Sequence, residues 1–288
     1  METGLTIAEA VVEAAQVLRR AGVPEARREA ASLLEHVTGR DRTFLITSAE
    51  TMLAPEDVSR LRHLVERRAA GEPLQYITGR QEFFKLDFEV TPDVLIPRPE
   101  TELLVETALD LLGEADGLAL ILDVGTGSGC IAVSLLHELA DARAIGVDIS
   151  EPALRVAARN AARAGVRERL RLVASDGLSA LDLSRARFTM IVSNPPYVAE
   201  DALAGLQREV RDHEPRVALT PGSDGLRLIR ALLADAPRFL DSGGHLLMEI
   251  GFDQREAVEG LIDTRAWQLL DIHKDLQGIP RTVALRKR

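Results

Sequence analysis

An α/β fold is predicted for this chain: a small helical domain and a β-hairpin linker precede a mostly parallel, seven-stranded sheet covered on both faces by helices. Three observations predict it. The first part of the chain repeats apolar residues with helical spacing, the next is rich in aromatic and β-branched residues, and the remainder alternates short aliphatic runs with helical stretches. Such alternation is typical of parallel strands connected by helices.

The helical domain is predicted over residues 1–73. Apolar residues recur at every third or fourth position from Leu5 to about Ala70, which is the pattern of amphipathic helices around a shared core. Thr6 and Glu9 have the spacing of a capping box, in which two side chains bind each other's backbone N–H at the start of a helix. We therefore expect the first helix to begin at this point.

The β-hairpin linker is predicted over residues 74–97. Gly79 and Pro92 interrupt this aromatic and β-branched segment, which favours short strands joined by a turn. The larger α/β domain is predicted over residues 98–288.

Seven short aliphatic runs are the predicted strands of the sheet. They cover residues 119–124, 144–148, 171–174, 190–193, 245–250, 267–272 and 282–285. The last two are too close together for a crossover helix, so they must pair antiparallel. A parallel sheet that ends in one antiparallel hairpin resembles the seven-stranded, Rossmann-like architecture of class I methyltransferases, although a fold alone does not establish chemistry.

Composition and charge restrict the functions that the chain could have. It has 288 residues and a net charge of −10, and such a field repels phosphate backbones, so direct nucleic-acid binding is not expected. The single cysteine, Cys130, permits no intrachain disulfide, which fits a reducing cytoplasm.

No run approaches the roughly 18 apolar residues of a membrane helix. Without ligand spacing among the histidines, no metal site is predicted. The histidines are His36, His63, His137, His213, His245 and His273.

A glycine-rich loop follows the first predicted strand of the sheet and opens a helix. Its residues are Gly125, Thr126, Gly127, Ser128 and Gly129. The glycines let backbone N–H groups approach a ligand at the carboxyl end of the sheet, but Cys130 stands where a dinucleotide fingerprint requires its third glycine. S-adenosylmethionine has no pyrophosphate, so the loop favours this cofactor over NAD. A plain glycine-rich turn is the structural alternative.

Further cofactor contacts are predicted at the ends of the next two strands. Asp148 lies about twenty residues after the loop, where a carboxylate can accept hydrogen bonds from both ribose hydroxyls. A helix cap is its alternative role, although Ser150 could fill that role instead. Asp176 and Gly177 follow the third strand, where an acceptor could bind the adenine amino group and a glycine lets the ring lie close to the backbone.

The most specific motif is Asn194-Pro195-Pro196-Tyr197, at the carboxyl end of the fourth strand. An amide nitrogen is a poor nucleophile because its lone pair is delocalised into the carbonyl. The Asn194 side-chain oxygen and the Pro195 carbonyl can accept both hydrogens of an NH₂ group and direct its lone pair toward a methyl donor. The prolines stiffen the turn, and Tyr197 offers a flat face to a planar group. These four residues are the predicted catalytic site.

Four segments together resemble the protein-(glutamine-N5) methyltransferases of class I peptide-chain release factors. They are residues 96–102, 123–129, 192–197 and 274–278, and the resemblance extends over essentially the whole chain. It implies that the cofactor is S-adenosylmethionine. It also implies that the substrate is the glutamine of the Gly-Gly-Gln motif in those release factors, and that Asn194 to Tyr197 bind its amide.

The resemblance also implies roles for two other regions. Arg98 and Thr101 lie in the segment that the family folds over the cofactor pocket, and the alternative is that the prolines around Arg98 only stiffen the domain linker. Residues 1–73 are expected to recognise the protein substrate, because one glutamine side chain offers too little surface for selectivity. A monomer is expected.

Two other functions remain open. A nucleic-acid base methyltransferase is the first, because exocyclic amines of adenine or guanine pose the same lone-pair problem. The acidic chain and its short helical domain argue against it. A scaffold that binds a translation factor without catalysis is the second, but the chain retains Asn194 and the loop glycines.

Overall fold

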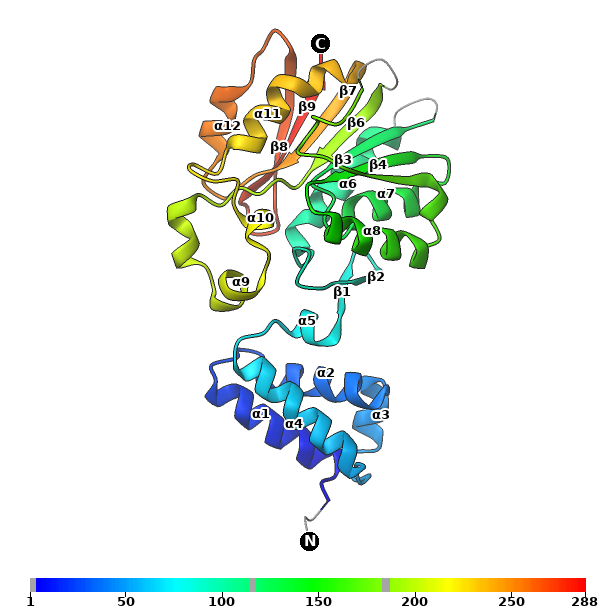
Figure 1. Ribbon diagram of the computed structural model, residues 1–288, viewed down its shortest axis with the longest axis vertical. Helices are drawn as coiled ribbons and strands as arrows, with labels where there is room; N and C mark the ends of the chain where they lie inside the picture. The colour runs from blue at the N-terminus through cyan, green and yellow to red at the C-terminus, as the bar shows by residue number, and fades with distance from the viewer. Residues whose placement is uncertain (1–3, 114–117, 183–186) are drawn as a thin grey trace. The chain divides into compact units, whose positions relative to one another are not determined.

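The computed structural model describes residues 4–113, 118–182 and 187–288 (Figure 1). The chain forms two compact units, of which the first is Met1–Gly79 with Gln207–His213 and the second is Arg80–Leu206 with Glu214–Arg288. The first unit thus includes a short stretch taken from the middle of the second unit's sequence. In the described part of the chain, no helix has both the length and the apolar character needed to cross a membrane.

The first unit consists of helices around one apolar core. The predicted capping box is present at its start, where the Thr6 N–H donates to Glu9 Oε2 (2.8 Å) and the Glu9 N–H donates to Thr6 Oγ1 (3.2 Å). Leu18, Leu33 and Leu34 are completely buried in the core. The helices are α1 (Ile7–Arg20), α2 (Ala26–Thr38), α3 (Arg42–Thr47), α4 (Pro55–Ala69), α5 (Leu74–Thr78) and α9 (Arg208–His213).

A buried ion cluster attaches α9 to the other helices of the first unit. The Arg68 side chain, on α4, is 7% exposed, and its guanidinium lies 2.5 Å from the Glu29 carboxylate on α2 and 3.0 Å from the Glu209 carboxylate on α9. A buried guanidinium is costly unless such partners surround it. The cluster therefore holds the segment Gln207–His213 in the helical unit.

The hairpin begins later than the sequence predicts, because residues 74–78 form helix α5 and not a strand. Gly79 ends this helix with a left-handed backbone (φ 73°), and the Thr78 hydroxyl donates to the Leu74 carbonyl (3.0 Å). A short run of aromatic and β-branched residues fits either a strand or one buried helical turn, so its composition could not distinguish them.

The hairpin itself packs in the second unit. Phe83 and Phe88 face each other across its strands, edge to face, with ring centroids 6.0 Å apart, and both are buried in that unit's core. The Asn160 side chain accepts from the Glu89 N–H (2.7 Å) and donates to the Glu89 carbonyl (3.0 Å). The two antiparallel strands are β1 (Arg80–Phe83) and β2 (Leu86–Glu89).

The second unit contains the predicted seven-stranded sheet, in the order β5-β4-β3-β6-β7-β9-β8 (Figure 1). Neighbouring strands pair parallel, except that β9 is antiparallel to both β7 and β8. The prediction of a parallel sheet with one antiparallel hairpin is confirmed. The strands are β3 (Leu120–Val124), β4 (Arg143–Asp148), β5 (Leu170–Ala174), β6 (Phe188–Ser193), β7 (Leu240–Glu249), β8 (Trp267–Lys274) and β9 (Pro280–Lys287).

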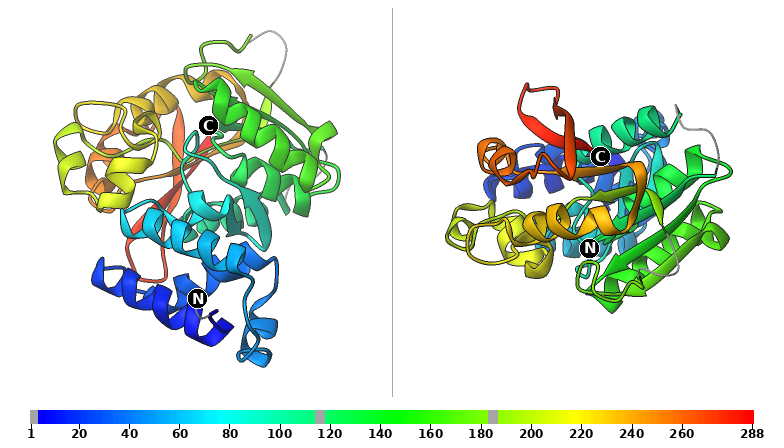
Figure 2. Two further views of the ribbon diagram at one scale, coloured as in Figure 1. Left: turned by 60° about the horizontal axis from the view of Figure 1, so that its bottom comes forward. Right: turned by 90° about the horizontal axis from the view of Figure 1, so that it is seen from above.

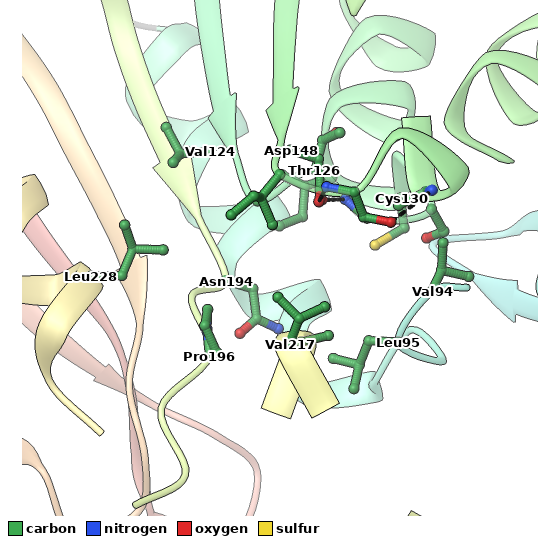
Figure 3. A pocket seen from close by; sticks show the side chains of 18 of the residues that line it. Val94, Leu95, Val124, Thr126, Cys130, Asp148, Asn194, Pro196, Val217 and Leu228 are labelled. Carbon is green, nitrogen blue, oxygen red and sulfur yellow. Dashed lines mark hydrogen bonds between the residues drawn. The ribbon is translucent and has the colours of Figure 1, made fainter. Parts of the chain in front are cut away.

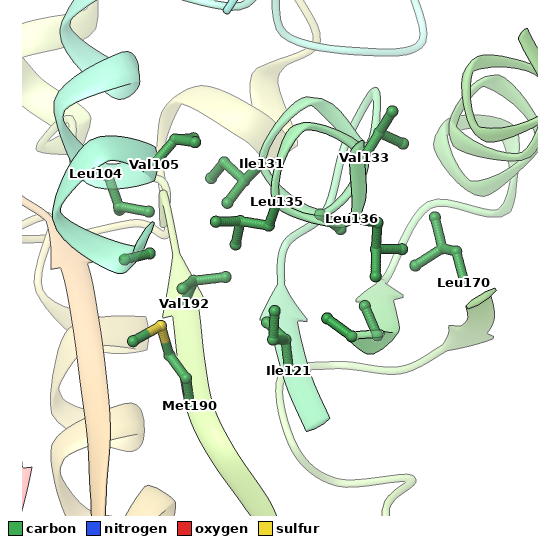
Figure 4. Close-up of a cluster of buried hydrophobic side chains, with 14 of the residues drawn as sticks. Leu104, Val105, Ile121, Ile131, Val133, Leu135, Leu136, Leu170, Met190 and Val192 are labelled. Atoms are coloured by element: carbon green, nitrogen blue, oxygen red, sulfur yellow. The ribbon is translucent and has the colours of Figure 1, made fainter. Parts of the chain in front are cut away.

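Helices cover both faces of the sheet (Figure 2). On one face, Leu104 of α6 and Leu135 of α7 pack with Val192 of β6 (Figure 4). On the other face, Ile229 of α11 belongs to the cluster that buries Trp267 of β8. The helices of this unit are α6 (Glu102–Gly113), α7 (Cys130–Glu138), α8 (Glu151–Arg163), α10 (Arg216–Leu219), α11 (Arg227–Asp235) and α12 (Arg255–Leu261). Short 3₁₀ turns are η1 (Pro99–Thr101), η2 (Arg167–Arg169), η3 (Glu200–Gly205) and η4 (Ala236–Arg238).

The direction in which the sheet grows reverses at β3. This strand pairs with β4 on one side and with β6 on the other, and all three run parallel. Their carboxyl ends therefore meet at one edge of the sheet, where chain segments leave in opposite directions and a crevice opens. Ligand sites of open α/β sheets form at such a point.

Candidate active site

A cavity lies at this edge of the sheet and belongs entirely to the second unit (Figure 3). The space that it encloses, its open mouth included, is about 1000 Å³. Figure 3 shows Thr126 and Asp148 on one side of the cavity and Asn194, Pro196 and Val217 on the opposite side. The strand ends thus supply two facing walls.

Most of the residues that the sequence predicts for the site line this cavity. They are Arg98, Thr101, Gly125, Thr126, Gly127, Ser128, Asp148, Asp176, Gly177, Asn194 and Pro196. Gly129, Pro195 and Tyr197 are not among the described residues that line it. Gly129 instead supports the loop from behind, since a Cβ there would lie 3.1 Å from the Cβ of Ala157 on α8.

The glycine-rich loop is fixed by its own backbone. The N–H groups of Gly125 and Thr126 both donate to the Val147 carbonyl at 2.9 Å, and the Gly129 N–H donates to the Thr126 carbonyl at 2.7 Å. Gly127 has φ 56°, in the left-handed region, and its N–H donates to Asp148 Oδ2 at 2.8 Å. These N–H groups are therefore engaged within the protein, in contrast to the expectation that they face a ligand. Close approach of the backbone is what the glycines provide.

Asp148 holds the loop and also lines the cavity. Its Oδ2 accepts from the Gly127 N–H and its Oδ1 accepts from the Ser150 N–H, each at 2.8 Å. Burial raises the pKa of this carboxyl, and backbone hydrogen bonds from Ser150, Gly127 and Ile149 oppose that effect. Ser150 caps α8 through the Ala153 N–H (3.3 Å), as the sequence allows. Each carboxylate oxygen keeps a further lone pair for a ligand.

Asp123 supports the glycine-rich loop without being among the described residues that line the cavity, and this role is not among those predicted from the sequence. It is completely buried at the end of β3, and its Oδ2 accepts from the Thr126 hydroxyl (2.7 Å) and the Ala132 N–H (3.3 Å). Burial raises the pKa of Asp123 to about 7. Among the described residues its Oδ1 has no hydrogen-bond partner. Its position as the first residue of the glycine-loop motif is the signal that could have identified it.

The end of β5 forms an adjacent wall of the cavity. Ser175 donates through its hydroxyl to the Gly177 carbonyl (2.9 Å) and accepts from the Ala180 N–H (3.1 Å), which closes a tight turn. Asp176 is exposed and lies 3.8 Å from the Arg227 guanidinium. Its carboxylate therefore stays accessible from the cavity.

Asn194 follows β6 and projects from the opposite wall. The Ser193 hydroxyl donates to the Val124 carbonyl (2.7 Å), which ties the ends of β6 and β3 together. The Asn194 side-chain NH₂ donates to Thr101 Oγ1 (3.0 Å). In the described part of the chain, its Oδ1 has no such partner and is the free end of the carboxamide.

Glu249, at the end of β7, is the second residue that the sequence reasoning missed. Its Oε2 accepts from the Thr101 hydroxyl at 2.6 Å and its Oε1 accepts from the Tyr197 hydroxyl at 3.3 Å. Burial raises the pKa of Glu249 to about 7, although the Thr101 hydrogen bond and the Arg281 charge oppose this. A single acid within the aliphatic run of residues 245–250 was the available signal. Burial likewise raises the pKa of the Tyr197 phenol.

The backbone after Tyr197 is held by two further residues without a recognisable sequence signal. The Gln254 side-chain NH₂ donates to the Tyr197 carbonyl (3.0 Å). Gly225 has φ 74°, and a Cβ there would lie only 2.2 Å from the same carbonyl oxygen. Only glycine fits at that approach.

Arg98 belongs to the segment that walls the cavity between β2 and α6. Its guanidinium pairs with Glu214 at 2.5 Å, and the other Glu214 oxygen accepts from the Ile96 N–H at 3.4 Å. The Glu214 side chain is 1% exposed. This buried carboxylate therefore fixes the 96–98 segment next to the cavity.

Two family comparisons cover separate parts of the chain. The PrmC N-terminal domain matches residues 9–79, and the Methyltransferase small domain matches residues 100–211. The release factor glutamine methyltransferase of Burkholderia pseudomallei is 47% identical over 276 residues, covering 93% of this chain and 94% of that protein. That of Geobacter sulfurreducens is 45% identical over 269 residues, covering 93% and 92%.

Solved structures show the same fold at low identity. A methyltransferase from Pyrococcus furiosus has a TM-score of 0.51 and 16% identity, covering 80% of this chain and 98% of its own. A 16S rRNA methyltransferase of T. thermophilus, in complex with AdoMet and guanosine, has a TM-score of 0.50 and 19% identity, covering 73% of this chain and 50% of its own. Likeness at this level concerns architecture and not substrate.

Proposed function

The chain belongs to the family of release factor glutamine methyltransferases, and from this premise we propose its substrate and site residues. It transfers the methyl group of S-adenosylmethionine to the side-chain amide nitrogen of the glutamine in the Gly-Gly-Gln motif of class I peptide-chain release factors. Asn194 is the residue that carries the proposal. Its NH₂ is bound to Thr101, so its oxygen is the end available to accept a hydrogen from an amide NH₂ in the cavity.

The cofactor side of the cavity fits a cationic ligand better than a pyrophosphate. Anion-binding glycine loops direct their N–H groups at phosphate, whereas here the N–H groups of Gly125, Thr126 and Gly127 are engaged within the protein. Asp148 and Asp176 contribute carboxylates to the lining. Such a lining supplies hydrogen-bond acceptors to a cationic ligand that carries hydroxyl and amino donors, as S-adenosylmethionine does, and it disfavours the pyrophosphate of a dinucleotide.

Individual contacts follow from the position of each residue around the cavity. Residues 125–129 would border the amino-acid part of the cofactor, Asp148 would accept from the ribose hydroxyls, and Asp176 and Gly177 would border the adenine. Arg98 and Thr101 would close the cavity from the side of the 93–101 segment, which contributes several lining residues.

Methyl transfer needs positioning more than it needs a strong base. When bound, S-adenosylmethionine supplies an electrophilic methyl carbon whose bond to sulfur breaks with the electron pair left on sulfur. Asn194 Oδ1 and the Pro195 carbonyl would accept the two amide hydrogens and hold the nitrogen lone pair in line with that carbon. The new N–C bond leaves positive charge on the nitrogen, which these two oxygens stabilise until a proton is lost to solvent.

The helical unit would recognise the release factor outside the glutamine. One of its grooves is lined by the exposed apolar residues Val12 (48%) and Ile46 (70%) together with Arg27, Arg28 and Arg42. A surface that combines apolar area with arginine is suited to a protein partner. None of the described residues of this unit is among those that line the cavity.

The experiment that tests this function uses labelled S-adenosylmethionine with an intact release factor and, in parallel, with its Gln→Ala variant at the Gly-Gly-Gln motif. Label on the wild-type factor, located by mass spectrometry to that glutamine, and none on the variant is the expected result. Label on both factors would place the acceptor elsewhere. Transfer to RNA or DNA instead would favour the base methyltransferase.

A further inference from the structure

We propose that Glu249 acts through Thr101 to orient the Asn194 carboxamide, so that the oxygen and not the NH₂ of Asn194 faces the acceptor amide. Glu249 is then a positioning residue of the methyl transfer. The identity of the acceptor rests on the proposed function, whereas the orientation of Asn194 is a property of the chain by itself.

Three segments far apart in the sequence meet in this network. Thr101 ends the turn η1, Asn194 follows β6, and Glu249 ends β7. The Thr101 hydroxyl lies 2.6 Å from Glu249 Oε2 and 3.0 Å from Asn194 Nδ2. Thr101 and Glu249 are each 1% exposed, so solvent offers no ready alternative partner to either side chain.

The direction of the hydrogen bonds follows from the number of protons available. An ionised carboxylate can only accept, so the single hydroxyl hydrogen of Thr101 points to Glu249. The Thr101 oxygen is then left with lone pairs alone, which attract the NH₂ of Asn194 and repel its Oδ1. A flipped carboxamide would direct its NH₂ at the acceptor NH₂, where two donors meet.

Protonation of Glu249 removes this constraint. A neutral Glu249 can donate to Thr101, whose hydrogen is then free to turn toward Asn194 and to stabilise the flipped carboxamide. Burial raises the pKa of Glu249 to about 7. The charged and titratable groups around it are Tyr197, Arg281, Glu100 and Cys130. Because the acid is ionised above its pKa, the productive orientation is favoured on the alkaline side of about pH 7.

The sequence allows a direct test, since Asn160 and Asn194 are its only asparagines. Asparagine labelled with nitrogen-15 in the side chain gives two NH₂ signals, and the one that survives in Asn194→Ala belongs to Asn160. Asn160 is the internal control, because its NH₂ donates to the carbonyls of Glu89 and Ser128. The full-length protein is titrated from pH 5.5 to 8.5.

We expect the Asn194 signals to shift with a midpoint near neutral pH in the wild type, and to stay constant in Glu249→Gln and in Thr101→Val. The Asn160 signals should stay constant throughout. Thr101→Ser, which keeps the hydroxyl, should restore the shift. A constant Asn194 signal in the wild type, or the same shift in Thr101→Val, would overturn the proposal. This readout requires no substrate.

Methylation of the release factor supplies the second readout. Glu249→Gln should lower kcat by roughly tenfold, less than the loss expected for a missing hydrogen-bonding group at the reacting atoms, with the Kd for S-adenosylmethionine unchanged. Thr101→Ser, which keeps the hydroxyl, should recover most of the kcat that Thr101→Val loses. Adding Thr101→Val to Glu249→Gln should cost little more than Glu249→Gln alone, since both substitutions break one network. Fully additive losses would contradict the proposal. If the wild type methylated no release factor while the Asn194 signals still titrated, only the proposed function would fail.

Discussion

The two walls of the cavity are built in different ways. On the wall proposed to bind the cofactor, called here the cofactor wall, Asp123, Thr126 and Asp148 form hydrogen bonds to residues within about one strand-helix-strand unit. On the wall proposed to bind the acceptor amide, called here the acceptor wall, Asn194 is held through Thr101, which lies 93 residues away in the sequence, and Thr101 is held by Glu249, 148 residues further along. The first wall depends on local backbone geometry, and the second depends on the assembly of the whole sheet.

This difference agrees with the proposed function. A cofactor is bound by the same contacts in every cycle, and a rigid backbone loop provides them. Methyl transfer to a weak nucleophile requires one carboxamide to be aimed correctly, and a side chain can be aimed only by other side chains whose own orientations are fixed. Mutations on the two walls should therefore separate cofactor affinity from turnover.

The largest separation is expected for Asn194→Ala. Loss of its Oδ1 should lower kcat by about a hundredfold or more, comparable to loss of one oxyanion-hole donor, while the Kd for S-adenosylmethionine changes little. Steady-state methylation of a release factor measures kcat, and calorimetry measures the Kd. Equal methyl transfer by the variant would remove Asn194 from the acceptor site.

A pH-dependent stability difference should separate Glu249→Gln from the wild type. Below about pH 4.5 the acid is protonated in both the folded and the unfolded state. Between 4.5 and about 7 it ionises only when unfolded, so the free energy of unfolding falls as pH rises. The whole interval corresponds to about 3 kcal/mol.

Glu249→Gln has no acid to ionise at this position, so its free energy of unfolding should not show this fall. Relative to the wild type, its free energy of unfolding should therefore rise by about 3 kcal/mol between pH 4.5 and pH 8. Urea unfolding of both proteins at the two pH values measures the change. Asp123 titrates in both proteins and cancels. A pH-independent difference would mean that Glu249 has an ordinary pKa in the folded protein.

Asp148→Ala tests the cofactor wall. Removal of a charged acceptor should weaken S-adenosylmethionine binding by roughly 1.5–3 kcal/mol, and loss of its bonds to Gly127 and Ser150 should also lower the melting temperature. Asp148→Asn, which keeps one acceptor oxygen, is the matched variant and should lose less of both. Calorimetry giving the wild-type Kd would leave Asp148 with a structural role alone.

Two glycines after Asn-Pro-Pro-Tyr offer a matched pair of substitutions. Gly222 and Gly225 both have positive φ, 95° and 74°, so alanine strains the backbone at either position. Only at Gly225 does the Cβ meet the Tyr197 carbonyl oxygen, at 2.2 Å, whereas nothing lies within 4 Å at Gly222. Gly225→Ala should be less stable than Gly222→Ala by about 1–3 kcal/mol, as for an overpacked core. It alone should also lower kcat. Equal losses would mean that the Tyr197 loop yields easily.

Some residues of the two walls could be predicted from the sequence, and others could not. The glycine loop, Asp148 and the tetrapeptide are contiguous or regularly spaced motifs, and the seven strands follow from aliphatic runs, so both were accessible from the sequence. Glu249 and Gln254 contact Tyr197 of the tetrapeptide because β7 pairs with β6. No local sequence pattern predicts which two strands pair, so these contacts could not be predicted. The composition of segment 74–78 fits one short strand of the hairpin as well as one apolar turn of helix, so it does not distinguish the two.

The smallest expected effect concerns Glu209, which lies in the short Gln207–His213 segment of the helical unit. The chain leaves the second unit after Leu206 and returns at Glu214, between the tetrapeptide and Val217 of the cavity lining. Glu209 binds Arg68 at 3.0 Å and is 36% exposed. Arg68 keeps Glu29 when Glu209 is neutralised, so Glu209→Gln should cost at most about 1 kcal/mol of stability.

A consequence for turnover is also expected, because residues 207–213 shortly precede Val217 of the cavity lining in the chain, so that release of the segment would leave the chain around Val217 less ordered. We expect faster proteolysis in that segment and a modestly lower kcat on the intact release factor, with an unchanged Kd for S-adenosylmethionine. Glu13→Gln is the control. The Glu13 side chain is 42% exposed and lies 2.8 Å from the Arg62 guanidinium in the same unit, and Glu13 is remote in sequence from the 207–213 segment. If both variants slowed methylation equally, surface charge on the helical unit would account for the effect. If neither variant slowed it, turnover would not depend on the ion pair between Glu209 and Arg68.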